Sequence, residues 1–380
     1  MALKPIRRVV TGNGERGMSR VVWDGPAPNA NEAPAGSGRG HTDLWVYTSC
    51  PAPLSGGNDD GNLPYDFPAH PNGGHLRVVQ SRGRPEDYDP ATDPQAVPLH
   101  EPQQRGVGRT WDKGGNNAFS SPIHMTESVD YGILLEGERV LLLDDRELVM
   151  RPGDVVVQLG NWHGWTSPRG DSRMAFVLMG ATFDALGLPG TPMRAGTPPD
   201  GVKPVRRIVT TEGEDGRSTA IHDGPSPDVR TDPARPGYAS TRIWVTDSTP
   251  AKIKGIQETL DLPHSLEPPP HGSMCRVVTI PPDATWTSRV GAREVEAFFQ
   301  AMGSPGASTY SPNAPHPYMQ KTRTLDFCLV LEGEITLVLD TGEVDLRALD
   351  IVVQRGTNHA WSNRSGGPAV VAISSHDGAP

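Results

Sequence analysis

The chain has 380 residues, of which 35% are hydrophobic and 21% charged, with 43 glycines and 39 prolines. This composition is typical of a globular protein with many turns, and it favours short strands over long helices. The formal net charge of −10 argues against nucleic acid as a partner, because binding to phosphates needs a basic surface. No segment is long and apolar enough to span a membrane, so no membrane partner is expected.

The cysteines and the N-terminus both indicate a location inside the cell. Cys50, Cys275 and Cys328 show no paired or metal-type spacing, which is typical of free thiols in a reducing compartment. The first residues lack the apolar stretch of a signal peptide. We therefore expect a cytoplasmic protein.

The chain contains two copies of one domain. Three segments of the first half return in the second half in the same order: 7–26 as 206–225, 124–138 as 320–334, and 154–165 as 350–361. The first pair of segments is identical at 11 of 20 positions. Such ordered matches at nearly constant offset indicate a duplication. A Pro/Gly-rich stretch separates the copies, so we predict an N-terminal domain over 1–185, a linker over 186–204 and a C-terminal domain over 205–380.

Most of the chain reads as strands. Residues 139–143 and 155–157 are short apolar runs bounded by Asp or Gly, and 335–340 puts Ile335, Leu337 and Leu339 on one face of a strand before a Thr-Gly turn. A single helix is predicted over 293–302, where Val295, Phe298, Phe299 and Met302 share a face. Many strands and almost no helix predict an all-β fold, a sandwich or barrel present twice.

The residues with the clearest chemical potential lie near 124–163. If the strand is regular, His124, Thr126 and Asp130 share one face. His163 follows about 40 residues later, after an apolar strand that ends in Gln158. If these strands pair inside one barrel, His124, Asp130 and His163 converge. Two imidazoles and one carboxylate form the ligand set of non-haem iron sites, which leave positions open for substrate and oxygen.

At these positions the chain resembles the cupin superfamily, and specifically the two-barrel bicupins. His124 matches the first histidine of the first cupin motif, Asp130 stands where the family has Glu, and Gly137 is the closing glycine; Gly160 and His163 match the second motif. Four motif positions of the first copy differ from the family pattern: Ala118, Thr126, Gln158 and Ser167. The resemblance covers the core of each copy.

The second copy departs further from the family pattern. It keeps Asp326 and His359, but Gln320 and Thr322 replace both histidines of the first motif. The resemblance therefore implies two tandem jelly-roll (cupin-like) β-barrels, with a metal site in the first barrel and a degenerate second barrel. It also implies a homodimer.

Each candidate residue also has a structural interpretation. Both copies retain the histidine and the aspartate of the His163 and Asp130 positions, so these side chains could instead satisfy buried hydrogen bonds. Four further residues are candidates for the lining of a pocket: Thr126, Phe119, Trp162 and Trp165. For the aromatic ones, core packing is an equal alternative. Tyr131 is expected to face away from Asp130.

Three functions are compatible with these residues. The first is a metal-dependent enzyme in which His124, Asp130 and His163 hold a divalent ion, preferably Fe(II), for dioxygenase-type oxidation of a small aromatic or polyketide-like molecule. The second keeps the site but uses Zn, Mn or Ni as a Lewis acid for isomerisation, cyclisation, decarboxylation or dehydration. The third is a metal-free binding protein. Without metal, Asp130 and His163 remain as acid–base candidates.

Overall fold

The computed structural model describes residues 3–62, 67–106, 108–183, 193–213, 215–253 and 258–380. Within these ranges the chain forms two nine-stranded sheets, three three-stranded sheets, one α-helix and five short 3-10 helices. The predicted all-β fold of two tandem jelly-roll (cupin-like) barrels is confirmed. No helix in the described ranges has the length and apolar character needed to cross a membrane.

The first large sheet has the strand order β17-β16-β13-β10-β15-β6-β4-β3, with β20 beside β15. Its strands are β3 (Asn29–Glu32), β4 (Gly40–Tyr47), β6 (Gly74–Ser81), β10 (Ser128–Glu136), β13 (Val155–Leu159), β15 (Ser172–Thr182), β16 (Arg206–Glu212), β17 (Ser218–Pro225) and β20 (Ala251–Lys252).

The second large sheet has the equivalent order β18-β19-β21-β27-β22-β25-β1-β2, with β5 beside β27. Its strands are β1 (Arg7–Asn13), β2 (Ser19–Pro26), β5 (Ala52–Pro53), β18 (Asp228–Thr231), β19 (Ala239–Thr246), β21 (Ser273–Ile280), β22 (Thr324–Glu332), β25 (Ile351–Arg355) and β27 (Ala369–Ala379).

A three-stranded sheet completes each barrel. The first barrel, called the N-barrel, adds β11 (Arg139–Leu142), β12 (Glu147–Met150) and β14 (Gly164–Thr166); the second, the C-barrel, adds β23 (Glu334–Leu339), β24 (Glu343–Arg347) and β26 (His359–Ser362). The remaining elements are β7 (Gln103–Arg105), β8 (Thr110–Asp112), β9 (His124–Thr126), α1 (Ala292–Ala301), η1 (Glu15–Gly17), η2 (Pro90–Thr92), η3 (Asp283–Thr285), η4 (Thr287–Arg289) and η5 (Pro305–Ala307).

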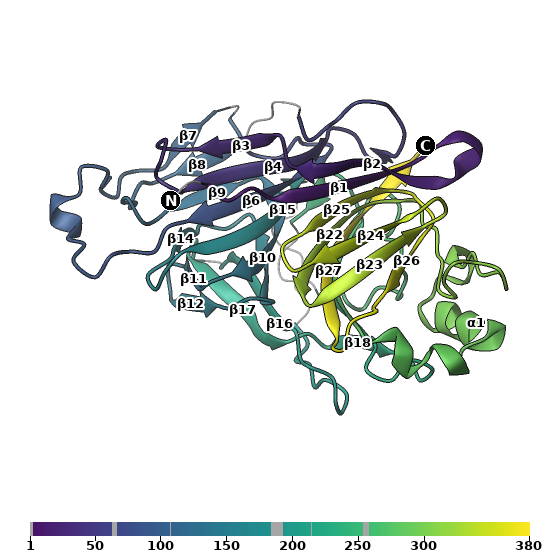
Figure 1. Ribbon diagram of the computed structural model, residues 1–380. Coiled ribbons are helices and arrows are strands. Elements are labelled where there is room, and N and C mark those ends of the chain that lie inside the picture. Colours follow the sequence, from purple (N-terminus) through teal and green to yellow (C-terminus); the bar gives the residue numbers. More distant parts are fainter. Residues whose placement is uncertain (1–2, 63–66, 107, 184–192, 214, 254–257) are drawn as a thin grey trace.

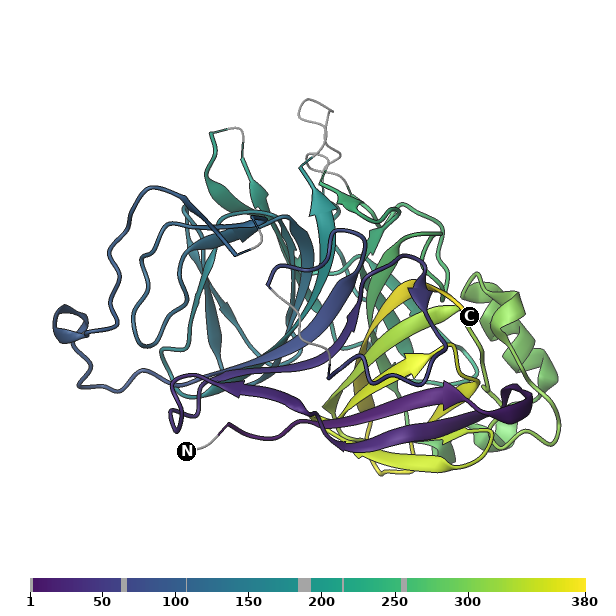
Figure 2. The same ribbon diagram turned by 90° about the horizontal axis from the view of Figure 1, so that it is seen from above.

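The two halves of the chain exchange their first hairpins. Hairpin β1–β2 runs along the C-barrel, where β1 pairs in parallel with β25, and hairpin β16–β17 runs along the N-barrel, where β16 pairs in parallel with β13 (Figures 1 and 2). The predicted ranges 1–185 and 205–380 follow the sequence repeats, whereas each large sheet combines strands from both. Of the predicted linker, 193–204 forms no strand or helix, and 186–192 lies outside the described residues.

The two large sheets pack against each other, and their period-2 alternation decides which side chains enter a barrel. In β10, Val129, Tyr131 and Ile133 lie in the core between the sheets. Asp130 shares the other face of β10 with Gly132 and Leu134 and lines the interior of the N-barrel. Tyr131 reaches the opposite half of the molecule, where its hydroxyl lies 2.9 Å from Oγ of Ser273. The prediction that Tyr131 faces away from Asp130 is confirmed.

The predicted helix corresponds to α1, shifted by one residue at each end. Val295, Phe298 and Phe299 are buried and join the core of the C-barrel, as does Met302 just beyond the helix. Residues 283–320, which contain α1, have no counterpart of this kind in the first half. Helix α1 lies at the far end of the C-barrel from the N-barrel (Figure 1).

Candidate functional site

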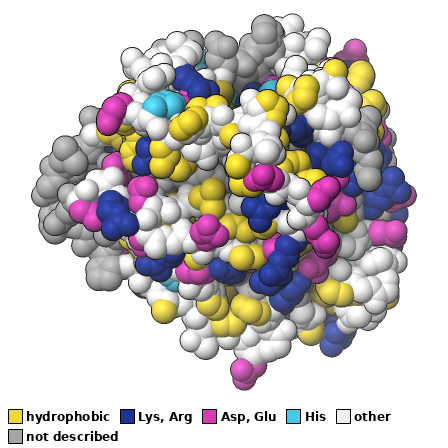
Figure 3. All heavy atoms as spheres, turned by 90° about the vertical axis from the view of Figure 1, so that its left-hand side faces the viewer, with side chains coloured by type: hydrophobic (Ala, Val, Ile, Leu, Met, Phe, Trp, Pro, Cys, Tyr) yellow, Lys and Arg dark blue, Asp and Glu magenta, His cyan; other side chains and the backbone are white. Residues whose placement is uncertain are grey.

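The N-barrel encloses a cavity of about 730 Å³. Side chains from the inner face of the large sheet, from β11 and from the segment leading into β9 line it, including His124, Asp130 and His163. A volume in this range suits a small organic ligand. Figure 3 shows the face of the molecule at the N-barrel end, where basic and acidic side chains are interspersed among apolar ones.

His124 and His163 lie side by side in the wall of this cavity. Their backbones form a bridge in both directions, with N···O distances of 2.9 and 3.0 Å, and their ring centroids lie 4.3 Å apart. Gly160 makes this approach possible, because it turns the chain after β13 with a φ of 59°, a conformation that glycine adopts without strain. The prediction that two histidines from distant segments meet is thus realised in the structure.

The environment fixes the same tautomer in both imidazoles. Nδ1 of His124 lies 2.9 Å from the carbonyl oxygen of Pro122, and Nδ1 of His163 lies 2.9 Å from that of Asn161. A carbonyl only accepts, so each Nδ1 carries the hydrogen and each Nε2 keeps its lone pair. Burial lowers the pKa of both side chains. Both imidazoles are therefore neutral, with their Nε2 atoms available as ligands.

Asp130 lines the same cavity, opposite Gln158 on the neighbouring strand β13. Burial raises the pKa of Asp130 to about 7. Oδ1 of Asp130 and both amide atoms of Gln158 are buried without a hydrogen-bond partner among the described residues. Oδ1 of Asp326 and both amide atoms of Gln354, the equivalent pair of the C-barrel, are likewise without a partner among the described residues. The pair therefore belongs to the shared framework of both barrels and does not by itself indicate a ligand.

The side chains of the cavity include ligands that suit a divalent metal ion, although the three predicted ligand atoms do not all lie close enough together to bind one ion. Two neutral imidazoles with oriented Nε2 atoms fit Fe(II), Zn, Mn or Ni, and the unsatisfied Asp130 carboxyl could supply an oxygen. However, the ligand atoms of His124, Asp130 and His163 do not all lie within 4.8 Å of one another in the described structure. The histidine pair is preassembled, whereas Asp130 stands apart from it.

The four predicted pocket residues divide into two groups. Phe119 and Trp165 line the cavity, and the Trp165 ring lies edge-on to His163 with centroids 6.1 Å apart. Thr126 and Trp162 do not line it, so the prediction is wrong for these two. Thr126 turns its hydroxyl to Oγ of Ser128, 2.7 Å away, and the Trp162 ring instead packs beneath Nζ of Lys113, 4.8 Å from its centroid.

Five arginines that the sequence did not point to also line the cavity: Arg39, Arg77, Arg82, Arg105 and Arg139. Three of them pair with carboxylates, Arg77 with Asp43, Arg82 with Asp171 and Arg105 with Asp112. Gln158 also lines the cavity, although in the sequence it stands out only as a departure from the family motif. A comparison of the two repeats offers a signal for Arg139, since Ile335 occupies the corresponding position.

The C-barrel has the same framework without the cavity. Gln320 takes the place of His124, and its Nε2 lies 3.1 Å from Nε2 of His359. Side chains of this interior, Arg235, Tyr318 and Gln320 among them, line a void of about 40 Å³. Arg235 fills much of the space, with its guanidinium 3.5 Å from the ring centroid of Tyr318 and 4.3 Å from that of Phe298. His359 is therefore a buried structural histidine.

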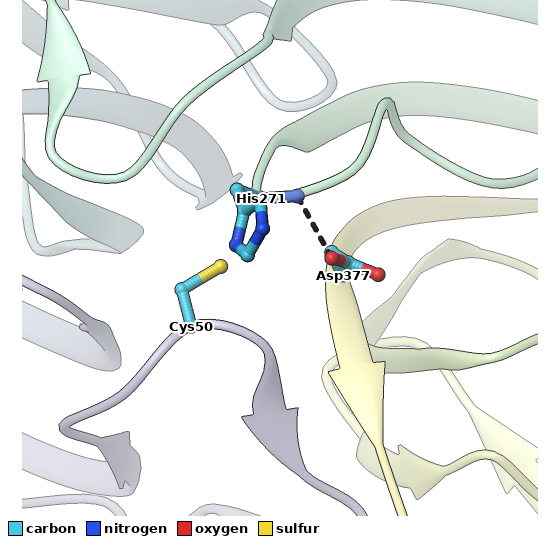
Figure 4. A group of neighbouring side chains, drawn as sticks. All are labelled: Cys50, His271 and Asp377. Atoms are coloured by element: carbon cyan, nitrogen blue, oxygen red, sulfur yellow. Dashed lines mark hydrogen bonds between the residues drawn. The ribbon is translucent and has the colours of Figure 1, made fainter.

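A second group of potential ligands lies outside both barrels. Cys50, His271 and Asp377 come from three separate segments, and their ligand atoms all lie within 4.8 Å of one another (Figure 4). Asp377 accepts a hydrogen bond of 2.8 Å from the backbone N–H of His271. A measurement of metal content must therefore distinguish metal bound by this group from metal bound in the N-barrel.

Comparisons with known proteins give short matches in sequence and a distant likeness in structure. No family model matches the chain. It is 56% identical over 48 residues to phomopsin biosynthesis cluster protein C′ of Diaporthe leptostromiformis, which covers 12% of this chain and 25% of that protein. It is 42% identical over 64 residues to the cupin-domain-containing oxidoreductase fogC of Aspergillus ruber (16% and 32%) and 45% identical over 64 residues to virC of Hypocrea virens (16% and 33%).

These matches span about a quarter to a third of the length of the curated relatives. Among solved structures, the protein Ylba of E. coli aligns over 91% of this chain and 86% of its own, with a TM-score of 0.37 and 9% identity. The oxalate decarboxylase of Lactobacillus farciminis aligns over 80% and 77%, with a TM-score of 0.34 and 12% identity. Likeness at this level carries no information on activity.

Proposed function

We propose that the N-barrel is the centre of a metal-dependent enzyme that acts on a small organic molecule, aromatic or polyketide-like, by a dioxygenase-type oxidation. The observation that carries the proposal is the pair of imidazoles that line a cavity of about 730 Å³, each with Nδ1 anchored and Nε2 without a hydrogen-bond partner among the described residues. Cupin-domain oxidoreductases among the partial sequence matches support the reaction class.

In this proposal His124 and His163 hold the ion, with Fe(II) preferred. When bound, such an ion would bring substrate and O₂ together and would pass electrons from the substrate to O₂, so that the organic molecule is oxidised. The protein supplies the surroundings: Phe119, Trp165 and Phe176 give the cavity apolar walls that orient a planar substrate and limit access of water.

Asp130 was predicted both as a third ligand and as an acid–base group. Its distance from the histidine pair favours the second role. Because burial raises its pKa to about 7, the carboxyl can hold or release a proton near neutral pH, at the unsatisfied Oδ1 that faces the cavity side of β10. His163, the other predicted acid–base residue, is committed to the metal in this arrangement.

Metal content tests the proposal first. Protein purified without chelator and measured by elemental analysis should contain about one equivalent in the wild type, and His124→Ala should lose it. Gln320→Ala and Cys50→Ser serve as matched controls, since one changes the corresponding position of the C-barrel and the other the group outside the barrels. Metal that leaves with Cys50→Ser but stays in His124→Ala would contradict a centre in the N-barrel.

The redox part of the proposal has its own test. After anaerobic loading with Fe(II), exposure to nitric oxide should give the EPR signal of a high-spin iron–nitrosyl complex in the wild type and none in His124→Ala, because nitric oxide occupies the position open to O₂. A stoichiometric Zn, Mn or Ni content without this signal would favour the Lewis-acid alternative, an isomerase, cyclase, decarboxylase or dehydratase. No metal under any loading would favour a non-catalytic binding protein.

A homodimer, the absence of nucleic-acid and membrane partners, and a cytoplasmic location remain proposals. Sedimentation equilibrium of the purified chain tests the first.

A further inference from the structure

The N-barrel contains a buried cation without a carboxylate partner. Arg139, the first residue of β11, has only 1% of its surface exposed and lines the cavity. Its Nη2 donates to Oγ of Ser81, and its Nε has no hydrogen-bond partner among the described residues. No ion pair of Arg139 is found in the described ranges, whereas Arg77, Arg82 and Arg105 of the same cavity each pair with a carboxylate. Arg39 also has no ion pair there, but its side chain is only partly buried.

Such a group is costly for a folded protein. An ionised side chain removed from water needs an opposite charge or a full set of hydrogen bonds. A single hydroxyl cannot satisfy a guanidinium with five N–H donors. Burial lowers the pKa of Arg139, and no nearby charge opposes that effect. The free energy of this arrangement therefore improves if an anion enters the cavity.

The C-barrel shows that the fold does not need an arginine here. Arg139 pairs with Met150 in β12, and the corresponding pair in β24 is Ile335 with Leu346. Ser81 likewise corresponds to Ile280. Ser81 pairs with Ser172, the first residue of β15, and Ile280 pairs with Ala369, the first residue of β27. Ile335 and Ile280 are both buried in the apolar core of the filled barrel. The polar pair thus occurs in the barrel that keeps a cavity, and an apolar pair replaces it where the cavity is closed.

We propose that Arg139 binds the carboxylate of an organic acid, so that the ligand of the N-barrel is an aryl or similarly unsaturated carboxylic acid. The guanidinium offers a planar fork that matches a carboxylate with two parallel hydrogen bonds. The aromatic walls formed by Phe119, Trp165 and Phe176 accommodate the rest of the molecule. The inference rests on the proposed function only for the identity of the site, because carboxylate binding itself requires no metal.

Calorimetric titration with matched probes tests this assignment. Benzoate, phenylacetate and cinnamate are compared with their neutral amides, on metal-free wild type and on Arg139→Lys and Arg139→Ile, the last of which installs the residue of the C-barrel. The wild type should bind at least one carboxylate and prefer it to the amide. Loss of the charge-assisted bonds in Arg139→Ile should weaken binding about 10- to 100-fold, and Arg139→Lys should lie between. Arg84→Gln, at an exposed arginine that does not line the cavity, is the control for removal of a positive charge and should leave the affinity unchanged.

Thermal unfolding distinguishes this role from a structural one. If the role of Arg139 is to bind an anion, ligand-free Arg139→Ile should melt at the same temperature as the wild type or at a higher one. The carboxylate that binds best should raise the melting temperature of the wild type and leave that of Arg139→Ile unchanged. A structural arginine would instead give a lower melting temperature in the variant and equal shifts with ligand.

Three results would overturn the proposal: no saturable binding of any carboxylate, equal affinity for acid and amide in the wild type, or unchanged carboxylate affinity in Arg139→Ile. The comparison of acid with amide needs only the wild type, so it decides even if the variants do not fold. Binding that persists in His124→Ala while metal is lost separates this inference from the proposed metal centre.

Discussion

Nε2 of Gln320 lies 3.1 Å from Nε2 of His359, at the place where His124 lies beside His163 in the other barrel. In both barrels Nδ1 of the second histidine lies 2.9 Å from a backbone carbonyl two residues earlier. The histidine of the C-barrel therefore has both ring nitrogens satisfied by the protein, whereas that of the N-barrel keeps one for a ligand. A single exchange of imidazole for carboxamide thus decides whether the protein itself satisfies Nε2 of the second histidine.

This relationship predicts the effect of Gln320→Ala. Removal of the amide leaves the buried Nε2 of His359 without a donor, and an unsatisfied buried acceptor costs about 1–3 kcal/mol. Chemical denaturation should show this loss in the free energy of unfolding, with unchanged metal content. Lys321→Ala, at the exposed neighbouring side chain, is the control and should stay within about 0.5 kcal/mol of wild type. Equal stability of both variants would mean that water replaces the amide.

The exchanged hairpins predict that the two halves stay together when the chain is cut. A protease site inserted between Asp200 and Gly201, which are exposed, separates the repeats covalently but leaves β1 paired with β25 and β16 with β13. The two fragments should elute as one species in native gel filtration and separate only in denaturant. Fragments that part under native conditions would contradict this exchange.

Equivalent arginines of the two exchanged hairpins predict unequal effects of removing their partners. Arg207 is fully buried and bound to the equally buried Glu258 at 3.0 and 2.9 Å; Arg8 is also fully buried, but the side chain of its partner Asp59 is 37% exposed. Glu258→Ala leaves the buried Arg207 guanidinium without its counter-charge and should lower the free energy of unfolding by about 3–5 kcal/mol. Asp59→Ala should cost less, because water can reach the vacated position. Equal losses in urea denaturation would refute the argument.

The repeats and the alternation of apolar residues were sufficient to predict two β-barrels and the helix near 293–302. They could not predict the exchange of hairpins, because 7–26 and 206–225 are similar enough to pair with either barrel. The pairing of each hairpin depends on tertiary contacts, such as those of Arg8 with the carbonyl oxygen of Leu44 and of Arg207 with the carboxylate of Glu258.

The candidate site was predictable where a residue has few structural alternatives. Imidazoles at 124 and 163 indicated a ligand pair, and both line the cavity with Asp130, Phe119 and Trp165. The prediction that Thr126 and Trp162 line the cavity was wrong. Strand β9 is only three residues long and a turn follows β13, so the regular alternation of side chains does not hold at either place. Arg139 was missed because an arginine at the start of a strand usually points to water.

His376 predicts how stability depends on pH. It is buried between the two large sheets, with Nδ1 2.8 Å from the Tyr47 hydroxyl, and burial lowers its pKa from 6.5 to about 3. Between these values the unfolded chain binds a proton that the folded chain does not. This group's contribution to stability is therefore present above pH 6.5 and is lost as pH falls, by about 1.4 kcal/mol per pH unit.

Urea denaturation at a series of pH values measures this contribution against His376→Asn. The variant should be less stable than wild type near neutral pH, because the asparagine does not fill the space of the imidazole. From the unperturbed histidine pKa down to about pH 5, however, the wild type should lose about 2 kcal/mol more than the variant. The remaining slope, common to both proteins, reflects other buried histidines such as His316 and His359, whose pKa values burial lowers to about 3 and about 4. Parallel curves for the two proteins would show that His376 takes up its proton in the folded state as readily as in the unfolded chain, and that the contact between the sheets admits water.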